Sequence, residues 1–294
     1  MSLDLKLLSS PDWTEYELLD SGNGRKLERF GTNILIRPEH QTIWQPRLPE
    51  EKWLAAQAVF LATGGDEMGG RWQLRKPVDP WVMQYKGLRF RAQLGGSRHV
   101  GVFPEQAAHW DWMGDLIRSA KRPVSVLNLF GYTGLATLAA ARDGAKVTHV
   151  DASKKSVAWA RENQVLSKLD DRNIRWLVDD AMKFVQREGR RQVHYDGLIL
   201  DPPKFGRGPK GEVWECFEML PKLLESCRAI LSRQPLFVVI TAYAIRASAL
   251  SLYYALGEMM KGESGRTEAG ELVVEERSAG RELSLAIFAR WGIG

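Results

Sequence analysis

Cysteine is scarce in this sequence, because only Cys216 and Cys227 occur among 294 residues. Two isolated cysteines exclude a disulfide framework and a four-cysteine metal site, and they fit a reducing cytoplasm. Long apolar runs are also missing: the longest, near residues 236–245, has the length of a buried strand and is too short to span a bilayer. The chain begins without a continuous apolar stretch, so we expect no secretory signal. The five histidines show no metal-ligand spacing, and we expect no bound metal.

Negative charge is slightly scarcer than positive charge, with 36 acidic and 41 basic residues and a formal net charge of +5. This balance favours an anionic partner without requiring one. The segment from residue 71 to residue 98 contains a single acid, Asp79, and seven basic residues with four interleaved aromatic residues: Arg71, Arg75, Lys76, Lys86, Arg89, Arg91 and Arg98, with Trp72, Trp81, Tyr85 and Phe90. Cations beside aromatic rings are typical of a nucleic-acid surface, and a solvated basic face over buried aromatics is an equally good interpretation.

Short, mixed patterns in the first third of the chain predict a small β-rich α+β domain. Residues 49–63 read as one helix, because a proline and two acids stand at its start. Alternating apolar and polar residues predict half-buried strands, and paired glycines predict turns. The strands lie at residues 33–38 and 88–94, and the turns at residues 21–24 and 64–65. Because the pattern changes after a further glycine pair, we divide the chain into domains at residues 1–98 and 99–294.

Strands and helices alternate in the second region. A helix over residues 104–120, with Trp110, Met113 and Ile117 on one stripe, precedes five apolar strands separated by helices. The predicted strands cover residues 124–130, 146–151, 174–180, 195–203 and 236–243. This βαβ repetition indicates a mostly parallel sheet that is covered on both faces, and residues 271–291 read as a closing antiparallel hairpin.

Ligands of such sheets bind beyond the carboxyl ends of the strands, so the residues that follow each strand are the candidates. The first strand ends in Asn128-Leu129-Phe130-Gly131-Tyr132-Thr133-Gly134, which lacks the three spaced glycines that a dinucleotide pyrophosphate needs. S-adenosylmethionine has no pyrophosphate and tolerates this turn. Asp151, at the end of the second strand, is placed to bind a ribose diol, and a carboxylate of the third strand can accept from the adenine amine. Asp151 and Ser153 are alternatively good caps for the next helix.

Four segments in order, "NLFGYTG", "HVDASKKSVAWARENQ", "VDDAMKF" and "LDPPKFGRG", resemble the class I S-adenosylmethionine-dependent methyltransferases. More narrowly, residues 98 to 291 are similar to the branch that contains bacterial ribosomal-RNA methyltransferases acting on cytosine C5 and guanine N7. The resemblance implies a Rossmann-like, seven-stranded α/β sheet with a C-terminal antiparallel hairpin. It also implies a set of residues around the cofactor S-adenosylmethionine: Gln106, Asn128, Phe130, Gly131, Tyr132, Thr133, Gly134, Asp151, Ser153, Asp179, Asp180, Ala181 and Asp201.

The acceptor side is implied by the same resemblance. Asp201, Pro202, Pro203 and Phe205 would position the methyl acceptor, although Lys204 stands where relatives that methylate base amines have an aromatic residue. Phe205, one place later, can still stack on a flipped base. The two prolines are also explained by a rigid end of the strand. Lys204, Arg207 and Lys210 can contact phosphates of the acceptor, and solvated loop charges are an equally good interpretation of them.

Methylation at cytosine C5 needs a cysteine thiolate, and the C5 relatives place it after the fifth strand, where this chain has Thr241-Ala242-Tyr243. Cys216 and Cys227 instead fall in a predicted helix over residues 212–231 and read as core thiols. The sequence therefore predicts a cytoplasmic methyltransferase that does not use the C5 mechanism. Its favoured acceptor is RNA, with ribosomal RNA preferred, while the alternatives are a protein or small-molecule acceptor, or a non-catalytic binding protein. No membrane contact is expected, and the oligomeric state is left open.

Overall fold

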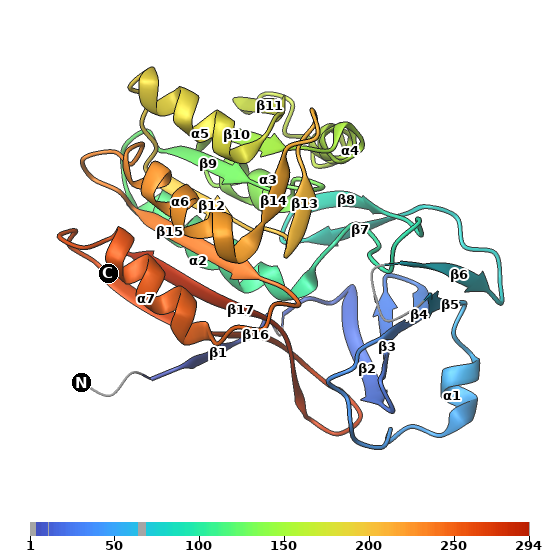
Figure 1. The fold of residues 1–294 in the computed structure, drawn as a ribbon. Coiled ribbons are helices and arrows are strands. Elements are labelled where there is room, and N and C mark those ends of the chain that lie inside the picture. Colours follow the sequence, from blue (N-terminus) through green and yellow to red (C-terminus); the bar gives the residue numbers. More distant parts are fainter. Residues whose placement is uncertain (1–3, 11, 64–68, 294) are drawn as a thin grey trace. The chain divides into compact units, whose positions relative to one another are not determined.

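The computed structural model describes residues 4–10, 12–63 and 69–293 (Figure 1). The chain forms two compact units, each built from separate segments. The large unit contains Met1–Leu8, Gln106–Leu272 and Leu285–Gly294, and the small unit contains Ser9–Glu105 and Val273–Ser284. The small unit therefore includes the tip of the C-terminal hairpin.

The large unit is built on a mixed sheet whose strand order is β1-β16-β17-β15-β12-β9-β10-β11. Its strands are β1 (Lys6–Leu8), β9 (Ser125–Leu129), β10 (Lys146–Asp151), β11 (Ile174–Val178), β12 (Gly197–Leu200), β15 (Phe237–Ala242), β16 (Arg266–Glu275) and β17 (Glu282–Gly292). Five of these strands run parallel to one another, namely β9, β10, β11, β12 and β15. β17 pairs antiparallel with β15. The predicted α/β sheet with a terminal hairpin is confirmed.

One strand of this sheet was not predicted. β1 pairs parallel with β16, with Lys6 opposite Gly270. Gly270 permits this approach, because a Cβ at that position would lie 1.8 Å from the carbonyl oxygen of Lys6. The described sheet therefore has eight strands, one more than the predicted seven.

Helices cover the parallel sheet in two layers (Figure 1). Along one layer α2 packs on α3 and α3 on α4, and along the other α5 packs on α6 and α6 on α7. Their bounds are α2 (Ala107–Ser119), α3 (Leu135–Arg142), α4 (Lys154–Leu166), α5 (Ala181–Arg190), α6 (Cys216–Arg228) and α7 (Ala249–Met259), and a 3-10 turn, η1 (Pro104–Gln106), precedes α2. The predicted stripe of Trp110, Met113 and Ile117 is buried on α2, as a helix facing a sheet requires.

A short hairpin, β13 (Phe205–Arg207) and β14 (Val213–Glu215), joins β12 to α6. The predicted helix over residues 212–231 is thus wrong at its start, because residues 213–215 are extended and the helix begins at Cys216. Both cysteines are buried in α6, at 1% and 0% exposure, so their prediction as core thiols is confirmed.

The small unit contains a sheet in the order β2-β3-β4-β5-β6 and a separate two-stranded ribbon, β7-β8. The bounds are β2 (Tyr16–Gly22), β3 (Arg25–Phe30), β4 (Asn33–Pro38), β5 (Ala58–Ala62), β6 (Gly70–Leu74), β7 (Trp81–Tyr85), β8 (Leu88–Ala92) and a helix, α1 (Glu50–Leu54). The turn predicted at residues 21–24 joins β2 to β3, with positive φ angles of 51° at Asn23 and 72° at Gly24.

The prediction of one helix over residues 49–63 is wrong beyond Leu54. Residues 58–62 form β5, which pairs parallel with β4 and antiparallel with β6. These partners are distant in sequence, and their backbone hydrogen bonds outweigh the local helical preference of the alanine-rich segment. The turn predicted at Gly64 and Gly65 lies outside the described residues.

Candidate functional site

The predicted site residues of the parallel strands come together at the carboxyl edge of the sheet. Leu129 of β9 pairs with Val150 of β10 and with Leu200 of β12, so the residues that follow these strands are neighbours. Backbone hydrogen bonds join them, since the amide of Gly131 donates to Val150 and the amide of Asp179 donates to Asp151, each over 3.1 Å.

The turn after β9 has an unusual backbone. The φ angles of Phe130, Tyr132 and Gly134 are 59°, 48° and 83°, in the left-handed region that aromatic residues rarely adopt. The turn is fixed from several sides: Gly134 donates to the carbonyl of Gly131 over 2.9 Å, and Asn163 of α4 donates its side-chain amide to the carbonyl of Thr133 over 3.0 Å. A strained backbone that its surroundings hold in place is typical of ligand sites.

The glycines of this turn are required by the protein's own packing. A Cβ on Gly131 would lie 2.4 Å from the His149 ring, and one on Gly134 would lie 2.8 Å from the Cβ of Ala160. The ring of His149 is itself held, because its Nδ1 lies 2.9 Å from the Thr137 hydroxyl and the ring packs against that of Trp176 in a tilted arrangement with a centroid distance of 4.6 Å. The turn therefore rests directly on a buried histidine that the sequence interpretation did not use.

Asn128, predicted as a cofactor residue, lies with His149 beneath the turn. Its side chain is 2% exposed, and its amide nitrogen donates to the Thr137 hydroxyl over 2.9 Å. Burial also lowers the pKa of His149 to about 3, so the ring is neutral at physiological pH. Asn128, Thr137 and His149 thus form an uncharged hydrogen-bonded chain beneath the turn.

Replacement of Gly131 by alanine is expected to destabilise the protein by about 1–3 kcal/mol, as overpacking in a fixed core does. The new methyl group would displace the turn from His149. Affinity for S-adenosylhomocysteine, the product that S-adenosylmethionine leaves after methyl transfer, should therefore fall as well. Gly257→Ala in α7 is the matched control: nothing lies within 4 Å of its Cβ position, and alanine favours helix by about 0.5–1 kcal/mol. Thermal unfolding and calorimetric titration measure both effects, and equal behaviour of the two variants would contradict the packing argument.

Asp151 fastens the end of β10 to the turn. Its Oδ2 accepts from the amide of Tyr132 over 2.9 Å, and its Oδ1 accepts from the amide of Ser153 over 2.8 Å. Burial raises the pKa of Asp151, although both amides oppose the rise. Each carboxylate oxygen retains a second lone pair, so this side chain can still accept from a vicinal diol. Ser153 is the N-cap of α4 and accepts from Ser156, which leaves its predicted cofactor role without structural support.

The acids after β11 also have structural partners. Asp180 caps α5, accepting from the amide of Lys183 over 2.9 Å, and Asp179 pairs with the guanidinium of Arg187. Ala181 is the first residue of α5 and is 6% exposed. Both acids, of which Asp180 is the one predicted to meet adenine, therefore lie at the expected edge and are held by hydrogen bonds.

The residues after β12 form hydrogen bonds with Gln106, which precedes α2, and with Trp214 of β14. Gln106 donates its amide to Asp201 Oδ2 over 3.2 Å, so these two predicted residues lie together. The indole of Trp214, in β14, donates to the carbonyl of Pro203 over 2.7 Å and packs on Phe130 with a centroid distance of 4.8 Å. Trp214 thus links the acceptor segment to the turn after β9.

Sequence reasoning missed Trp214 because it placed this residue in a helix. Its neighbour Glu212 was missed for the same reason: it binds Lys183 of α5 over 2.6 Å, and that hydrogen bond lowers the pKa of Glu212 to about 2.

The basic segment of residues 71–98 lies in the small unit. Tyr85 and Phe90 are 3% and 0% exposed, so the interpretation of these rings as base-stacking platforms is wrong. They face the core because alternate residues of β7 and β8 point inward, which leaves Arg89 on the solvent side, and Lys86 is exposed in the turn between the strands. The alternative interpretation, a solvated basic face over buried aromatics, holds for these two rings, whereas Trp72 and Trp81 are partly exposed.

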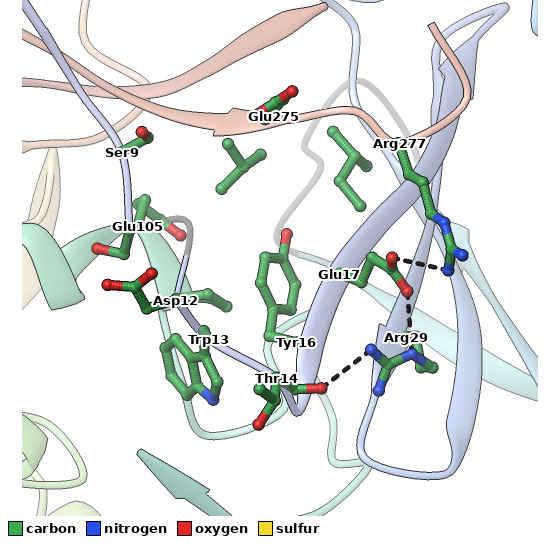
Figure 2. A pocket seen from close by; sticks show the side chains of 14 residues that line it. Ser9, Asp12, Trp13, Thr14, Tyr16, Glu17, Arg29, Glu105, Glu275 and Arg277 are labelled. Atoms are coloured by element: carbon green, nitrogen blue, oxygen red, sulfur yellow. Dashed lines mark hydrogen bonds and ion pairs between the residues drawn. The ribbon is translucent and has the colours of Figure 1, made fainter. Parts of the chain in front are cut away.

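A cavity of about 500 Å³ lies within the small unit and contains none of the predicted site residues (Figure 2). Glu17 lines the cavity, and its carboxylate accepts hydrogen bonds from Arg29 over 3.2 Å and from Arg277 over 2.9 Å. Arg29 also donates to the carbonyl of Thr14. The lining also includes the acids Asp12, Glu105 and Glu275, and we assign no ligand to this cavity.

Residues 4–10, 12–63 and 69–293, which the structure describes, contain no group of three or more His, Cys, Asp or Glu side chains arranged to hold a metal ion. Among them, too, every helix is too short or too polar to cross a bilayer.

Comparisons with known proteins agree with this geometry. The S-adenosylmethionine-dependent methyltransferase family matches residues 51–247. A solved structure of a SAM-dependent methyltransferase from Agrobacterium tumefaciens is similar over 100% of this chain and 97% of its own, with 46% identity and a TM-score of 0.94.

Curated relatives match part of the chain. The ribosomal RNA large subunit methyltransferase K/L of Shewanella sp. (strain ANA-3) is 32% identical over 43% of this chain and 17% of its own length. The ribosomal RNA large subunit methyltransferase I of Aeromonas salmonicida is 30% identical over 58% of this chain and 40% of its own. This chain therefore covers less than half the length of either relative.

Proposed function

The chain belongs to the S-adenosylmethionine-dependent methyltransferase family, and we propose that it methylates RNA, with a base of ribosomal RNA as the favoured acceptor. The observation that carries the acceptor class is Phe205, which lies one residue beyond the Asp201-Pro202-Pro203 segment, after Lys204, and is 63% exposed. An exposed ring beside a methyl-transfer site provides a stacking surface for a flipped base. The names of the two ribosomal-RNA relatives support the same class.

The residues at the carboxyl edge fit the cofactor by their chemistry. Asp151 offers anchored carboxylate oxygens to a ribose diol, and the turn of residues 130–134 needs no third glycine because the cofactor has no pyrophosphate. When bound, S-adenosylmethionine supplies a methyl group on a sulfonium, which is transferred by in-line displacement. The remaining task of the protein is to orient the acceptor and to exclude water.

Asp201 is the group that we assign to acceptor orientation. Its carboxylate can accept from an N–H or O–H of the acceptor, and the hydrogen bond from Gln106 holds it at the strand end. Pro202 is buried and the carbonyl of Pro203 is held by Trp214, so this exit is rigid. The acceptor atom is then a ring nitrogen, an exocyclic amine or an oxygen.

A cytosine C5 acceptor does not fit, because burial raises the pKa of both Cys216 and Cys227 and keeps them protonated in the core. Their reduced, buried state agrees with a cytoplasmic location, which we include in the proposal. Transfer to a protein or a small molecule by the same edge is the competing function.

Replacement of Phe205 by alanine is expected to reduce the rate of RNA methylation at limiting RNA by about 5- to 150-fold, because stacking contributes about 1–3 kcal/mol per base. The protein and the cofactor are incubated with RNA from a strain that lacks the gene, and methylated nucleosides are identified by mass spectrometry. The expected product is any methylated nucleoside other than 5-methylcytidine. Formation of 5-methylcytidine, or an unchanged rate for the variant with intact cofactor binding, would exclude the proposed acceptor geometry.

A further inference from the structure

Exposed apolar side chains gather on the β13–β14 hairpin and the helix that follows it. Phe205, Val213 and Phe217 are 63%, 68% and 53% exposed, although they lie within one short segment of the chain. Single exposed apolar residues are common on soluble proteins, but several neighbouring ones mark an interaction site.

The hairpin geometry brings these side chains together. In the antiparallel ladder Phe205 lies opposite Glu215, and Arg207 lies opposite Val213. Residues at these alternate positions share one face, whereas Trp214 lies on the other face and is buried. The amide of Cys216 donates to the carbonyl of Lys204 over 3.0 Å, so Phe217, in the first turn of α6, begins directly beside the end of the ladder. We call Arg207, Val213 and Phe217 the hairpin surface.

The hairpin is held rigidly by its own acids. Glu212 binds Lys183 and also accepts from the amide of Lys210 over 2.9 Å. The side chain of Glu215 caps α6, accepting from the amide of Glu218 over 2.8 Å. Both acids are thus occupied inside the large unit. In the part of the chain that the structure describes, Arg207 takes part in no ion pair, and neither do the nearby side chains of Lys204 and Lys210.

A rigid surface with an exposed ring and unneutralised cations has the chemistry of a single-stranded RNA site. The ring can stack on a base face, which only an unpaired nucleotide exposes, and the cations can contact phosphates. A duplex would offer phosphates and no base face. A second copy of this chain is less suited as an occupant, because the cations of both copies would be brought together.

We propose that the hairpin surface binds an unpaired nucleotide that flanks the target base, so that the RNA acceptor is recognised as a single-stranded or looped segment. This inference rests on the proposed function, and it assigns Arg207, Val213 and Phe217 to RNA binding rather than to the methyl-transfer site. Exposed side chains of this kind can be replaced with little effect on folding.

The test measures binding of a fluorescein-labelled single-stranded RNA of mixed sequence, and of the same RNA annealed to its complement, by fluorescence anisotropy. Phe217→Ala is expected to weaken single-strand binding by about fivefold or more. Its matched control is Tyr254→Ala, which removes a ring that is 64% exposed on α7. Arg207→Gln is expected to weaken binding and to reduce the salt dependence by about one charge, whereas Arg190→Gln at the end of α5 should not. Affinity for S-adenosylhomocysteine should be unchanged in all four variants.

The possible outcomes are distinct. If Phe217→Ala binds RNA as tightly as Tyr254→Ala does, or if duplex binds the wild type as tightly as single strand, the hairpin surface is not an unpaired-RNA site. The proposed function then still stands wherever the wild type methylates RNA. Self-association that is lost in Phe217→Ala, without an effect on RNA, would identify a second copy as the occupant and overturn the inference. A wild type that neither binds nor methylates RNA would overturn the proposed function itself.

Discussion

Replacement of Asp151 by alanine is expected to weaken binding of S-adenosylhomocysteine by about 100-fold. The variant loses a carboxylate that fastens the turn through the amides of Tyr132 and Ser153, and with it the acceptor assigned to the ribose diol. Hydrogen bonds to a charged group contribute about 1.5–3 kcal/mol, and each 1.4 kcal/mol corresponds to tenfold in affinity. Isothermal titration calorimetry measures this loss without any need for an RNA acceptor.

The matched control for this experiment is Asp171→Ala, which removes an exposed carboxylate of the same unit that lies 3.7 Å from Arg172. Its affinity should stay within about twofold of the wild type, as surface charges contribute little. If Asp151→Ala bound the cofactor product as tightly as this control, the second strand end would have no role in cofactor binding.

Replacement of Arg37 by methionine is expected to destabilise the small unit by about 3–5 kcal/mol. Arg37 binds the carboxylate of Glu28 through two nitrogens, over 2.6 and 2.7 Å, and Glu28 is fully buried. Without the guanidinium, Glu28 retains the hydroxyl of Tyr16 at 2.9 Å and the ammonium of Lys26 at 3.8 Å. These partners offset only part of the cost of a buried charge.

Thermal unfolding measures this effect, and Arg29→Met provides the comparison. Arg29 pairs with Glu17 over 3.2 Å, but both side chains are partly exposed, at 30% and 23%. Its removal should cost about 0–1 kcal/mol. Similar losses for the two variants would contradict the assignment of Arg37 as the partner that makes burial of Glu28 tolerable.

The same pair predicts how stability depends on pH. Burial alone would raise the pKa of Glu28, but the charges of Arg37 and Lys26 outweigh burial and hold the pKa below its ordinary value of 4.5. A carboxyl whose pKa is lower in the folded state stabilises the fold above the unfolded pKa. The stability that Glu28 contributes is therefore complete above about pH 4.5 and is lost as the pH falls through the lower, folded pKa. In Arg37→Met the sign should reverse: burial then outweighs the remaining charge of Lys26 and raises the pKa of Glu28 above its unfolded value, so the variant should lose stability as the pH rises through that raised pKa and recover it at acid pH.

The sequence was informative where the physics is local and repeated. Asp151 and Asp201 could be placed at one edge because each directly follows an apolar run, and parallel strands separated by helices end on the same side of a sheet. The stripe of Trp110, Met113 and Ile117 follows from helical spacing in the same way. These predictions needed no knowledge of distant partners.

The sequence was uninformative where a contact joins distant segments. β5 exists because it pairs with β4 and β6, and nothing within residues 58–62 distinguishes it from a continued helix. Three-residue strands such as β13 and β14 are too short to show a period of two, so the hairpin was missed. Likewise, no local signal indicates that residues 273–284 belong with the small unit.

The side chains beneath the site show the same limit. Asn128 was predicted to contact the cofactor because it lies at the end of an apolar strand, and the structure directs its amide to Thr137. His149 showed no ligand spacing and was not assigned a role, although it supports the turn at Gly131. A sequence gives the position of a polar residue along a strand. Whether its side chain packs beneath the site or faces a ligand depends on the neighbouring strands.

Transfer of radiolabelled methyl from S-adenosylmethionine tests the central claim most directly. An extract of a strain that lacks this gene is incubated with the wild type or with Asp201→Ala and is then separated into RNA, protein and small-molecule fractions. We expect label in one size class of RNA with the wild type and a large decrease with the variant. Label confined to protein or small molecules, or absent although S-adenosylhomocysteine binds, would contradict an RNA methyltransferase with this site.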